Sequence, residues 1–142
     1  MKVREAMTRN VQVADPTETI EQAAKLMADL DVGSLPVGQD DQLVGMITDR
    51  DIAVRAVATG KGPGTKVREV MSKNIKYCFD DEEIEVVSRN MGDIQVRRLP
   101  VIDRDKRLVG ILSLGDMAVN DASAAARALG GVSRPAGAHN QR

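Results

Sequence analysis

Apolar residues recur along this chain with two different spacings, and the spacing predicts the elements. Between residues 20 and 30, and again between 84 and 94, they return every three or four positions, which is typical of a helix with one buried face. Shorter runs rich in valine, isoleucine and leucine predict strands instead. We expect strands at residues 11–13, 75–77, 43–48 and 108–113, strands beginning at Leu35 and Leu99, and a second helix over residues 50–59.

Capping and turn residues mark the ends of these elements. Thr19 precedes the first helix and Gln22 follows three residues later, a pair that forms a capping box at a helix start. Polar residues at 38–42 and 103–107 separate pairs of predicted strands, which indicates hairpins. Each half of the chain is therefore predicted to be β-α-β-β-α. A further helix is expected over residues 121–129, followed by a disordered tail.

The chain contains an internal tandem repeat. The segment Lys2-Val3-Arg4-Glu5 recurs as Lys66-Val67-Arg68-Glu69, 64 positions later. Leu35-Pro36-Val37 recurs as Leu99-Pro100-Val101 at the same offset. Such self-similarity indicates a duplicated structural unit. The predicted organisation is a first repeat at residues 1–60, a linker at 61–64, a second repeat at 65–125, and a helical extension with a disordered tail at 126–142.

The strongest functional signal is a strand that turns directly into a helix, and it occurs twice. The residues at this junction are Gly45, Thr48 and Asp51 in the first copy and Gly110, Ser113 and Asp116 in the second. Unpaired N–H groups at a helix start attract anions, so the junction suits a phosphorylated ligand. Structural interpretations stay open, because hydroxyl residues cap helices, first-turn aspartates complement the helix dipole and glycines permit close strand packing.

Composition narrows the classes of function. The formal net charge is −1 and aromatic residues are scarce, which argues against a nucleic-acid partner. Cys78 is the only cysteine and His139 the only histidine, so neither a disulfide, a metal site nor a histidine general base is expected. The charged start is no secretory signal, and no apolar run approaches the roughly 18 residues that span a bilayer. We therefore predict a cytoplasmic protein with no membrane contact.

With both copies in view, the chain resembles a tandem pair of CBS domains, the module named after cystathionine β-synthase. The resemblance covers residues 1–125 and rests on the two Gly-x-x-Thr/Ser-x-x-Asp junctions, each downstream of a Leu-Pro-Val. It implies an α+β fold in which two β-α-β-β-α repeats pack with pseudo-two-fold symmetry and leave two clefts. In the family these clefts commonly hold AMP, ADP, ATP or S-adenosylmethionine. The module is usually regulatory, and stand-alone bacterial members often dimerise.

The resemblance also implies roles for individual residues. Asp51 and Asp116 would accept hydrogen bonds from ribose hydroxyls, because a carboxylate is an acceptor only. Thr48 and Ser113 would donate to phosphate, helped by the amides of the helix start. The other implied contacts are Arg50, Arg97 and Arg98 with phosphate, Val11, Val13, Ile75 and Tyr77 with adenine, and the backbone of Ser34, Leu35, Arg98 and Leu99 with the edge of the base.

The two copies differ at the junction. Copy one has Gly33-Ser34 where copy two has Arg97-Arg98, and Asp49-Arg50 where copy two has Leu114-Gly115. We expect the second copy to bind phosphate more tightly, with Asp49 either repelling phosphate or capping its helix. The arginine pair has an alternative interpretation as a solvated or dimer-facing patch.

These observations predict a regulatory sensor that binds an adenosine-containing ligand and acts through a homodimer or an unidentified effector protein. No cofactor is required beyond that regulatory ligand. A homodimer is expected because apolar residues of the second helices, Val57 and Met117 among them, would otherwise contact water. Two other classes stay open. One is a structural or protein-binding CBS module without a nucleotide site, and the other is a nucleotide hydrolase, which lacks a Gly-x-x-x-x-Gly-Lys phosphate loop here.

Overall fold

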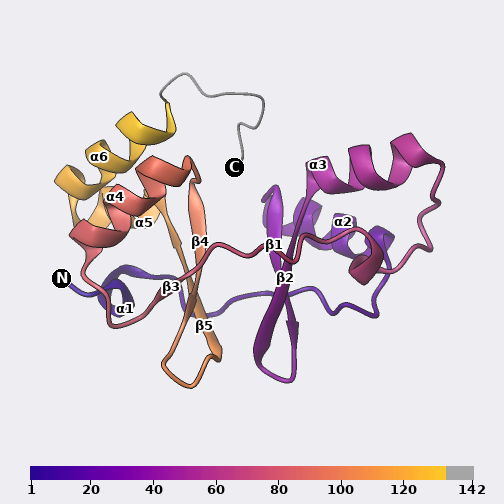
Figure 1. Cartoon of the computed structure of the whole chain (residues 1–142), viewed down its shortest axis with the longest axis horizontal. Coiled ribbons are helices and arrows are strands. Elements are labelled where there is room, and N and C mark those ends of the chain that lie inside the picture. The colour runs from indigo at the N-terminus through magenta and orange to yellow at the C-terminus, as the bar shows by residue number, and fades with distance from the viewer. Residues whose placement is uncertain (134–142) are drawn as a thin grey trace. The chain divides into compact units, whose positions relative to one another are not determined.

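The computed structural model describes residues 1–133, so the expected disordered tail and His139 lie outside the described part. The chain divides into two compact units (Figure 1). The first-repeat unit is formed by residues 12–75, and the second-repeat unit by residues 1–11 together with the chain from Lys76 onward. Each repeat therefore gives its opening segment to the unit built around the other repeat.

The first-repeat unit is a helix, a hairpin and a second helical segment. Its elements are α2 (Ile20–Leu30), β1 (Ser34–Gln39), β2 (Gln42–Thr48), α3 (Asp49–Asp51), a π-helical turn (Ile52–Ala56), and two 3-10 turns, Val57–Thr59 and Val67–Glu69. The predicted capping box is confirmed, because the Thr19 hydroxyl accepts from the Gln22 N–H and the Gln22 side chain accepts from the Thr19 N–H. The hairpin pairs Leu35 with Ile47.

The second-repeat unit repeats this plan and adds a helix. Its elements are α1 (Val3–Ala6), β3 (Cys78–Phe79), α4 (Ile84–Ile94), β4 (Arg98–Ile102), β5 (Leu108–Ser113), α5 (Leu114–Asn120) and α6 (Ala122–Val132). The sheet order is β3-β4-β5, with β3 parallel to β4 and β5 antiparallel to β4. Mixed helix and strand in both units confirm the predicted α+β class.

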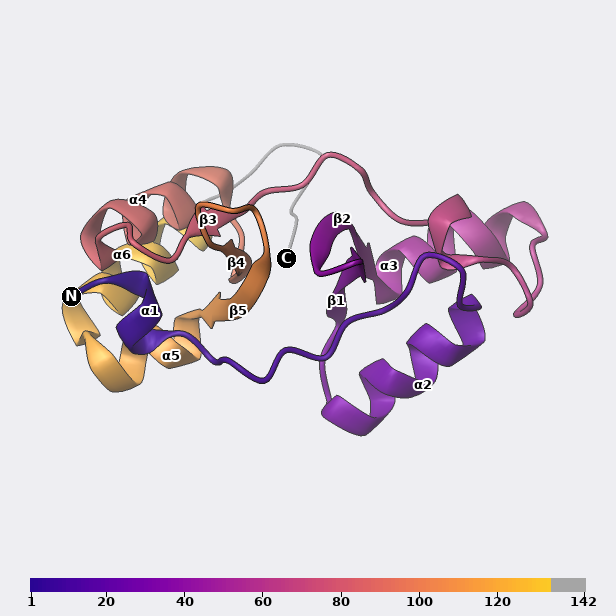
Figure 2. The same cartoon turned by 90° about the horizontal axis from the view of Figure 1, so that it is seen from below.

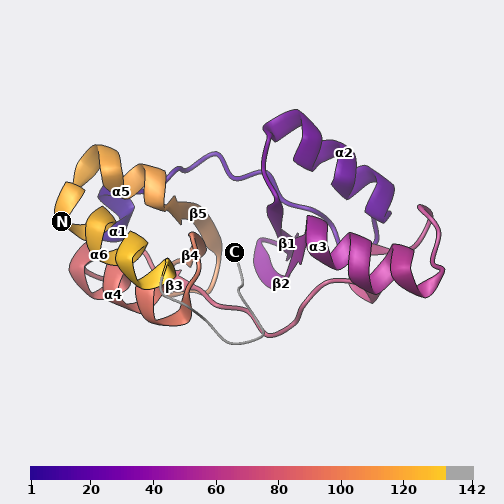
Figure 3. The ribbon, with the colours of Figure 1, turned by 90° about the horizontal axis from the view of Figure 1, so that it is seen from above.

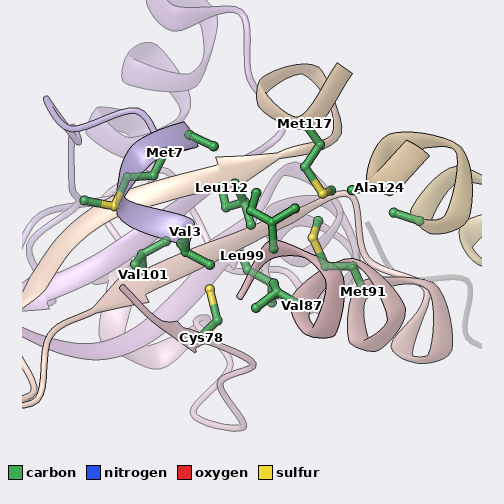
Figure 4. Close-up of a cluster of buried hydrophobic side chains, with 13 residues drawn as sticks. Val3, Met7, Cys78, Val87, Met91, Leu99, Val101, Leu112, Met117 and Ala124 are labelled. Carbon is green, nitrogen blue, oxygen red and sulfur yellow. The ribbon is translucent and has the colours of Figure 1, made fainter. Parts of the chain in front are cut away.

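Among the residues that the structure describes, the core of the second-repeat unit contains no aromatic side chain. Figure 4 shows Val87 and Met91 of α4, Leu99 of β4 and Met117 of α5 pointing into one cluster. Val3 of α1 belongs to the same cluster and is 0% exposed. An opening segment from the start of the chain is therefore a structural part of this core.

A glycine in each hairpin permits the opening segment to cross the sheet closely. The Thr8 N–H donates to the Ile111 carbonyl, and a Cβ at Gly110 would lie 2.9 Å from the Thr8 carbonyl oxygen. Ser72 pairs with Met46 in the same way, and a Cβ at Gly45 would lie 3.0 Å from the Ser72 carbonyl oxygen. Figure 2 shows α1 beside α5 and β5 in the second-repeat unit. Strand packing alone is thus sufficient to require both glycines.

The additional helix α6 covers α4. The two helices lie side by side in Figure 3, and α6 also contacts α5. Their backbones approach closely at Gly92 and Gly131, where a Cβ on Gly131 would overlap the Gly92 backbone. The predicted helix after residue 121 is confirmed, with the Asp121 carboxylate accepting from the Ala124 N–H at its start.

The first strand of each repeat was predicted wrongly. Residues 75–77 precede β3, which begins at Cys78, and residues 11–13 are followed by a single parallel bridge between Ala14 and Val37. Cys78 and Ala14 are the buried positions, so the pairing begins where a side chain first enters the core. Each repeat therefore has a shorter first strand than the apolar spacing suggests.

Three apolar side chains lie differently from the prediction. Leu30 and Ile94, expected on buried helix faces, are 41% and 37% exposed because each ends its helix beyond the edge of the core. Met117, expected on an exposed helix face, is 0% exposed because α6 completes the core around it. No helix within the described residues is long and apolar enough to span a membrane.

Candidate functional site

The strand-to-helix junction of copy one is a closed pair of hydrogen bonds, which we call corner one. The Asp51 N–H donates to the Thr48 hydroxyl oxygen at 2.9 Å, and the Thr48 N–H donates to Oδ2 of Asp51 at 3.0 Å. This capping box holds the carboxylate in a fixed orientation. Both side chains are half-buried, so they keep access to solvent.

Corner two has the same geometry with serine in place of threonine. The Asp116 N–H donates to the Ser113 hydroxyl oxygen at 3.1 Å, and the Ser113 N–H donates to Oδ2 of Asp116 at 3.0 Å. The capping interpretation is therefore correct for both corners. Capping leaves each side chain able to make a further hydrogen bond, because a hydroxyl that accepts from an amide still has its own proton to donate.

The second carboxylate oxygen differs between the corners. Oδ1 of Asp51 accepts no hydrogen bond from any residue that the structure describes. Oδ1 of Asp116 accepts from the Thr8 hydroxyl at 3.2 Å. Sequence reasoning missed Thr8, although the repeat contained a signal: Thr8 follows Met7 as Ser72 follows Met71. Thr8 and Asp116 are 108 residues apart, so only folding brings them together.

The expectation of unpaired amides at the helix start is wrong for corner one. The Asp49 N–H donates to the Gly33 carbonyl at 2.9 Å, and the Arg50 N–H donates to Oδ1 of Asp49 at 2.8 Å. With the Asp51 N–H held by Thr48, all three first-turn amides have partners. The Asp49 carboxylate also lies against Gly33, where an added Cβ would be 3.1 Å from its Oδ2.

Corner two leaves more of its backbone open. The Leu114 N–H donates to the Arg97 carbonyl at 3.1 Å, the counterpart of the bond between Asp49 and Gly33. The next amide, that of Gly115, has no hydrogen-bond partner among residues 1–133. Leu114 stands at the position of Asp49 and has no carboxylate, so no side chain at this position accepts from the Gly115 N–H as Asp49 accepts from the Arg50 N–H.

The start of each middle strand lies beside its corner. In the antiparallel register Ser34 is paired with Thr48, and Arg98 with Ser113. Arg98 is half-buried and Arg97 is exposed. The two neighbouring leucines, Leu35 and Leu99, are each 2% exposed, so only their backbone can meet a ligand.

The predicted adenine contacts are divided between the units. Val11 and Tyr77 belong to the second-repeat unit, and Val13 and Ile75 to the first-repeat unit. Tyr77 is 48% exposed and meets Phe79 edge-on, with ring centroids 5.7 Å apart. An exposed ring of this kind offers a flat apolar face to a planar ligand.

An ion pair and an aromatic contact lie at the loop after β3. Arg104 makes two hydrogen bonds with Asp81, at 2.8 and 2.7 Å, and its guanidinium carbon lies 3.9 Å from the centre of the Phe79 ring. The hydrogen bond from Arg104 lowers the pKa of Asp81. The two charges are paired with each other, and the pair links the loop after β3 to the β4–β5 turn that contains Arg104.

Cys78 has the properties of a core residue. It is 4% exposed, and burial, followed by the charges of Glu82 and Asp80, raises its thiol pKa to about 12. A protonated thiol is a poor nucleophile and a poor metal ligand. Within the described residues no group of three or more histidine, cysteine, aspartate or glutamate side chains is placed to hold a metal ion.

Each of the two repeats matches the same known protein family. The family model described as CBS domain matches residues 3–57 and 67–121. The chain therefore belongs to the CBS-domain family, with two domains in tandem. It is 44% identical over 121 residues to the CBS domain-containing protein YhcV of Bacillus subtilis, covering 85% of this chain and 86% of that protein. It is also 38% identical over 117 residues to hypoxic response protein 1 of Mycobacterium tuberculosis, covering 81% of each chain.

Solved structures of CBS-domain pairs are similar to this fold. CBSX2 of Arabidopsis thaliana in complex with AMP has a TM-score of 0.75 at 27% identity, covering 86% of this chain and 96% of that one. The CBS-domain pair of protein MJ0100, in complex with 5′-methylthioadenosine and S-adenosyl-L-methionine, has a TM-score of 0.73 at 27% identity, covering 87% and 97%. Hypoxic response protein I with two coordinated zinc ions has a TM-score of 0.75 at 37% identity, covering 84% and 98%.

Proposed function

We propose that this protein is a regulatory sensor, not an enzyme, and that it binds an adenosine-containing ligand at its two corners. AMP, ADP, ATP, 5′-methylthioadenosine and S-adenosylmethionine are the candidate ligands. The observation that carries the proposal is the duplicated aspartate, held at Oδ2 by a backbone amide in each corner. Two similar CBS-domain pairs, CBSX2 and MJ0100, have structures with AMP or adenosyl sulfur compounds bound.

Each corner offers a set of groups that matches a nucleoside. The half-buried carboxylates of Asp51 and Asp116 supply acceptors for vicinal ribose hydroxyls, and the Thr48 and Ser113 hydroxyls retain a proton to donate. Within each unit the base would lie against an apolar side chain, Val13 in the first-repeat unit and Tyr77 in the second-repeat unit, near the backbone of that unit's own middle strand. Arg97 and Arg98 in corner two would meet phosphate, as would Arg50 in corner one with any ligand that carries phosphate. Binding would change the protein's output only by favouring one conformation over another.

Conservative substitution of the two aspartates tests this proposal. Asparagine keeps an oxygen that can accept from the backbone amide but replaces the other acceptor with a donor, so the cap survives while the ribose contact is lost. We expect the unaltered chain to gain about 2.7 kcal/mol of unfolding free energy at a ligand concentration 100 times its dissociation constant. We expect D51N together with D116N to abolish that gain for AMP and S-adenosylmethionine.

The control is Asp41→Asn, the same chemical change in the β1–β2 turn, where asparagine tolerates the observed φ of 64°. It should melt and bind like the unaltered chain. If the unaltered chain shows no thermal shift and no calorimetric heat with any of the five ligands, the sensor proposal is wrong and a protein-interaction module without a nucleotide site is favoured.

We propose in addition that the chain forms a homodimer in the cytoplasm and passes its signal to an effector protein. Val54 and Val119 occupy equivalent positions on the helices that follow the corners and are 47% and 85% exposed. Val57, which begins the 3-10 turn directly after the π-helical turn that contains Val54, is 67% exposed. Exposed apolar side chains at equivalent positions of both copies favour contact with another protein surface. Sedimentation at micromolar concentration should give a dimer, and a monomer would contradict this part of the proposal.

A further inference from the structure

Asp49 and Leu114 occupy the same position in the two corners and have opposite chemistry. Each donates its N–H to the residue before the middle strand, Gly33 in corner one and Arg97 in corner two. The backbone of the two corners is therefore the same at this point. The difference lies in the side chains: the Asp49 carboxylate lies beside Gly33, whereas the Leu114 side chain is apolar and packs against the core of its unit.

The Asp49 carboxylate is held in place at corner one. Its Oδ1 accepts from the Arg50 N–H at 2.8 Å, and its Oδ2 would lie 3.1 Å from a Cβ at Gly33. Glycine at 33 thus leaves the space that the carboxylate fills. A phosphate group approaching this turn would meet a fixed negative charge and amides that already have partners.

The charged groups around the two corners have opposite sums. Corner one has two carboxylates, Asp49 and Asp51, and one exposed guanidinium, Arg50. Corner two has the single carboxylate of Asp116 and two guanidinium groups on Arg97 and Arg98. Over these residues the formal charge is negative in corner one and positive in corner two.

We infer that Asp49 and Leu114 determine which ligand charge each corner accepts. Corner one takes an adenosyl ligand without phosphate, such as adenosine, a thioether of adenosine or its cationic sulfonium. Corner two takes adenosine phosphates. This inference rests on the proposed function, because it assigns ligand classes to the same two corners. It makes the chain a sensor of two chemically different adenosyl compounds.

Reciprocal exchange of the two residues tests the inference in the full-length chain. Binding of AMP and of adenosine is measured by calorimetry, with one corner disabled at a time. In D116N, which leaves corner one, adding D49L should raise the affinity for AMP relative to adenosine about three- to tenfold. In D51N, which leaves corner two, adding L114D should lower that ratio by a similar factor. Adenosine itself should change little in either exchange.

Asp49→Asn separates charge from shape. The amide oxygen of asparagine can still accept from the Arg50 N–H, so the turn is kept while the negative charge is removed. In the D116N background D49N should shift the AMP-to-adenosine ratio in the same direction as D49L. Thermal melts confirm that each variant is folded before its binding is compared.

The outcomes distinguish this inference from the proposed function. If the unaltered chain binds both probes but neither exchange changes the ratio, the assignment of ligand charge is overturned and the sensor proposal stands. If D116N binds neither probe, corner one has no ligand and the assignment is overturned as well. If the unaltered chain binds neither AMP nor adenosine, the proposed function fails and this inference with it.

Discussion

A single residue in this protein can serve both local structure and ligand binding, and the two roles use different atoms. Asp51 uses Oδ2 and its own N–H to close the cap with Thr48, which leaves Oδ1 for another partner. Asp116 uses Oδ2 in the same way, while its Oδ1 accepts from Thr8. The capping box therefore orients the carboxylate that the sensor proposal requires. A helix cap and a ligand site both require a hydroxyl residue followed three positions later by an aspartate, so the sequence pattern is the same for the two roles.

Cys78 supports a prediction at the scale of one residue. Its thiol pKa is raised to about 12 by burial, so the thiol stays protonated at pH 8 in the folded chain. We expect iodoacetamide at pH 8 to leave Cys78 unmodified for as long as the chain is folded, because the thiolate is the reacting form. In denaturant, where the burial is lost, the same reagent should modify it fully.

Intact-protein mass spectrometry with and without denaturant measures both states. Fast alkylation of the native chain would show that β3 opens readily, which would contradict the buried position of Cys78 beside Val101.

At the scale of elements, α6 is the part of the second-repeat unit that the first-repeat unit lacks among its described residues. It lies on α4 and buries Ala124, Ala128 and Val132 against it and α5. In the second-repeat unit this contact depends on the close approach of Gly92 and Gly131. A small residue on each helix allows the backbones to meet, and any side chain would separate them.

Adjacent glycines in α6 provide a matched pair of substitutions. Gly131→Ala places a Cβ against the Gly92 backbone, so α6 must shift, and we expect a loss of about 1–3 kcal/mol in unfolding free energy. A Cβ at Gly130 meets no atom within 4 Å. Gly130→Ala should therefore stabilise the chain by about 0.5–1 kcal/mol through helix propensity alone.

Chemical denaturation of the two variants beside the unaltered chain measures both effects. Equal stability of the two variants would contradict the packing of α6 on α4.

At the scale of the whole molecule, the compact units are not the sequence repeats. The opening segment of the chain adds Val3 and Met7 to the core of the second-repeat unit, more than 60 residues before the rest of that unit begins at Lys76. Val67 and Met71, from the opening of the second sequence repeat, complete the core of the first-repeat unit, which is continuous from residue 12 to residue 75. A hairpin in each unit therefore needs a segment that is distant in the sequence.

This exchange predicts which fragments fold. Residues 65–133 contain the second sequence repeat but lack Val3 and Met7, which are 0% and 8% exposed in the full chain. We expect this fragment to be unfolded, because its core would have a cavity and an uncovered edge at Gly110. Residues 1–11 joined through a glycine-serine linker to residues 76–133 should fold.

Dispersion of amide proton resonances and a cooperative thermal transition distinguish the two fragments. A stably folded fragment of residues 65–133 would show that the exchange is dispensable, and the division into units would then have no energetic basis.

Short-range patterns determined a large part of this protein from the sequence alone. The tandem repeat, the Thr19 capping box, the two long helices and both hairpins depend on residues a few positions apart or on direct self-similarity, so the linear pattern contains them. The two corners and their hydroxyl and carboxylate residues were found for the same reason. Family membership followed from those motifs.

Long-range contacts were decided only by the tertiary structure. The sequence pattern does not show that Thr8 reaches Asp116, that the Gly33 and Arg97 carbonyls take the first helical amides, or that Met117 is covered by α6. The first strands were misplaced because their pairing begins where Ala14 and Cys78 enter a core made by other segments. The spacing of residues along the chain determines local hydrogen bonds such as helix caps. The burial of a helix or strand face depends instead on which segment, distant in the sequence, packs against it.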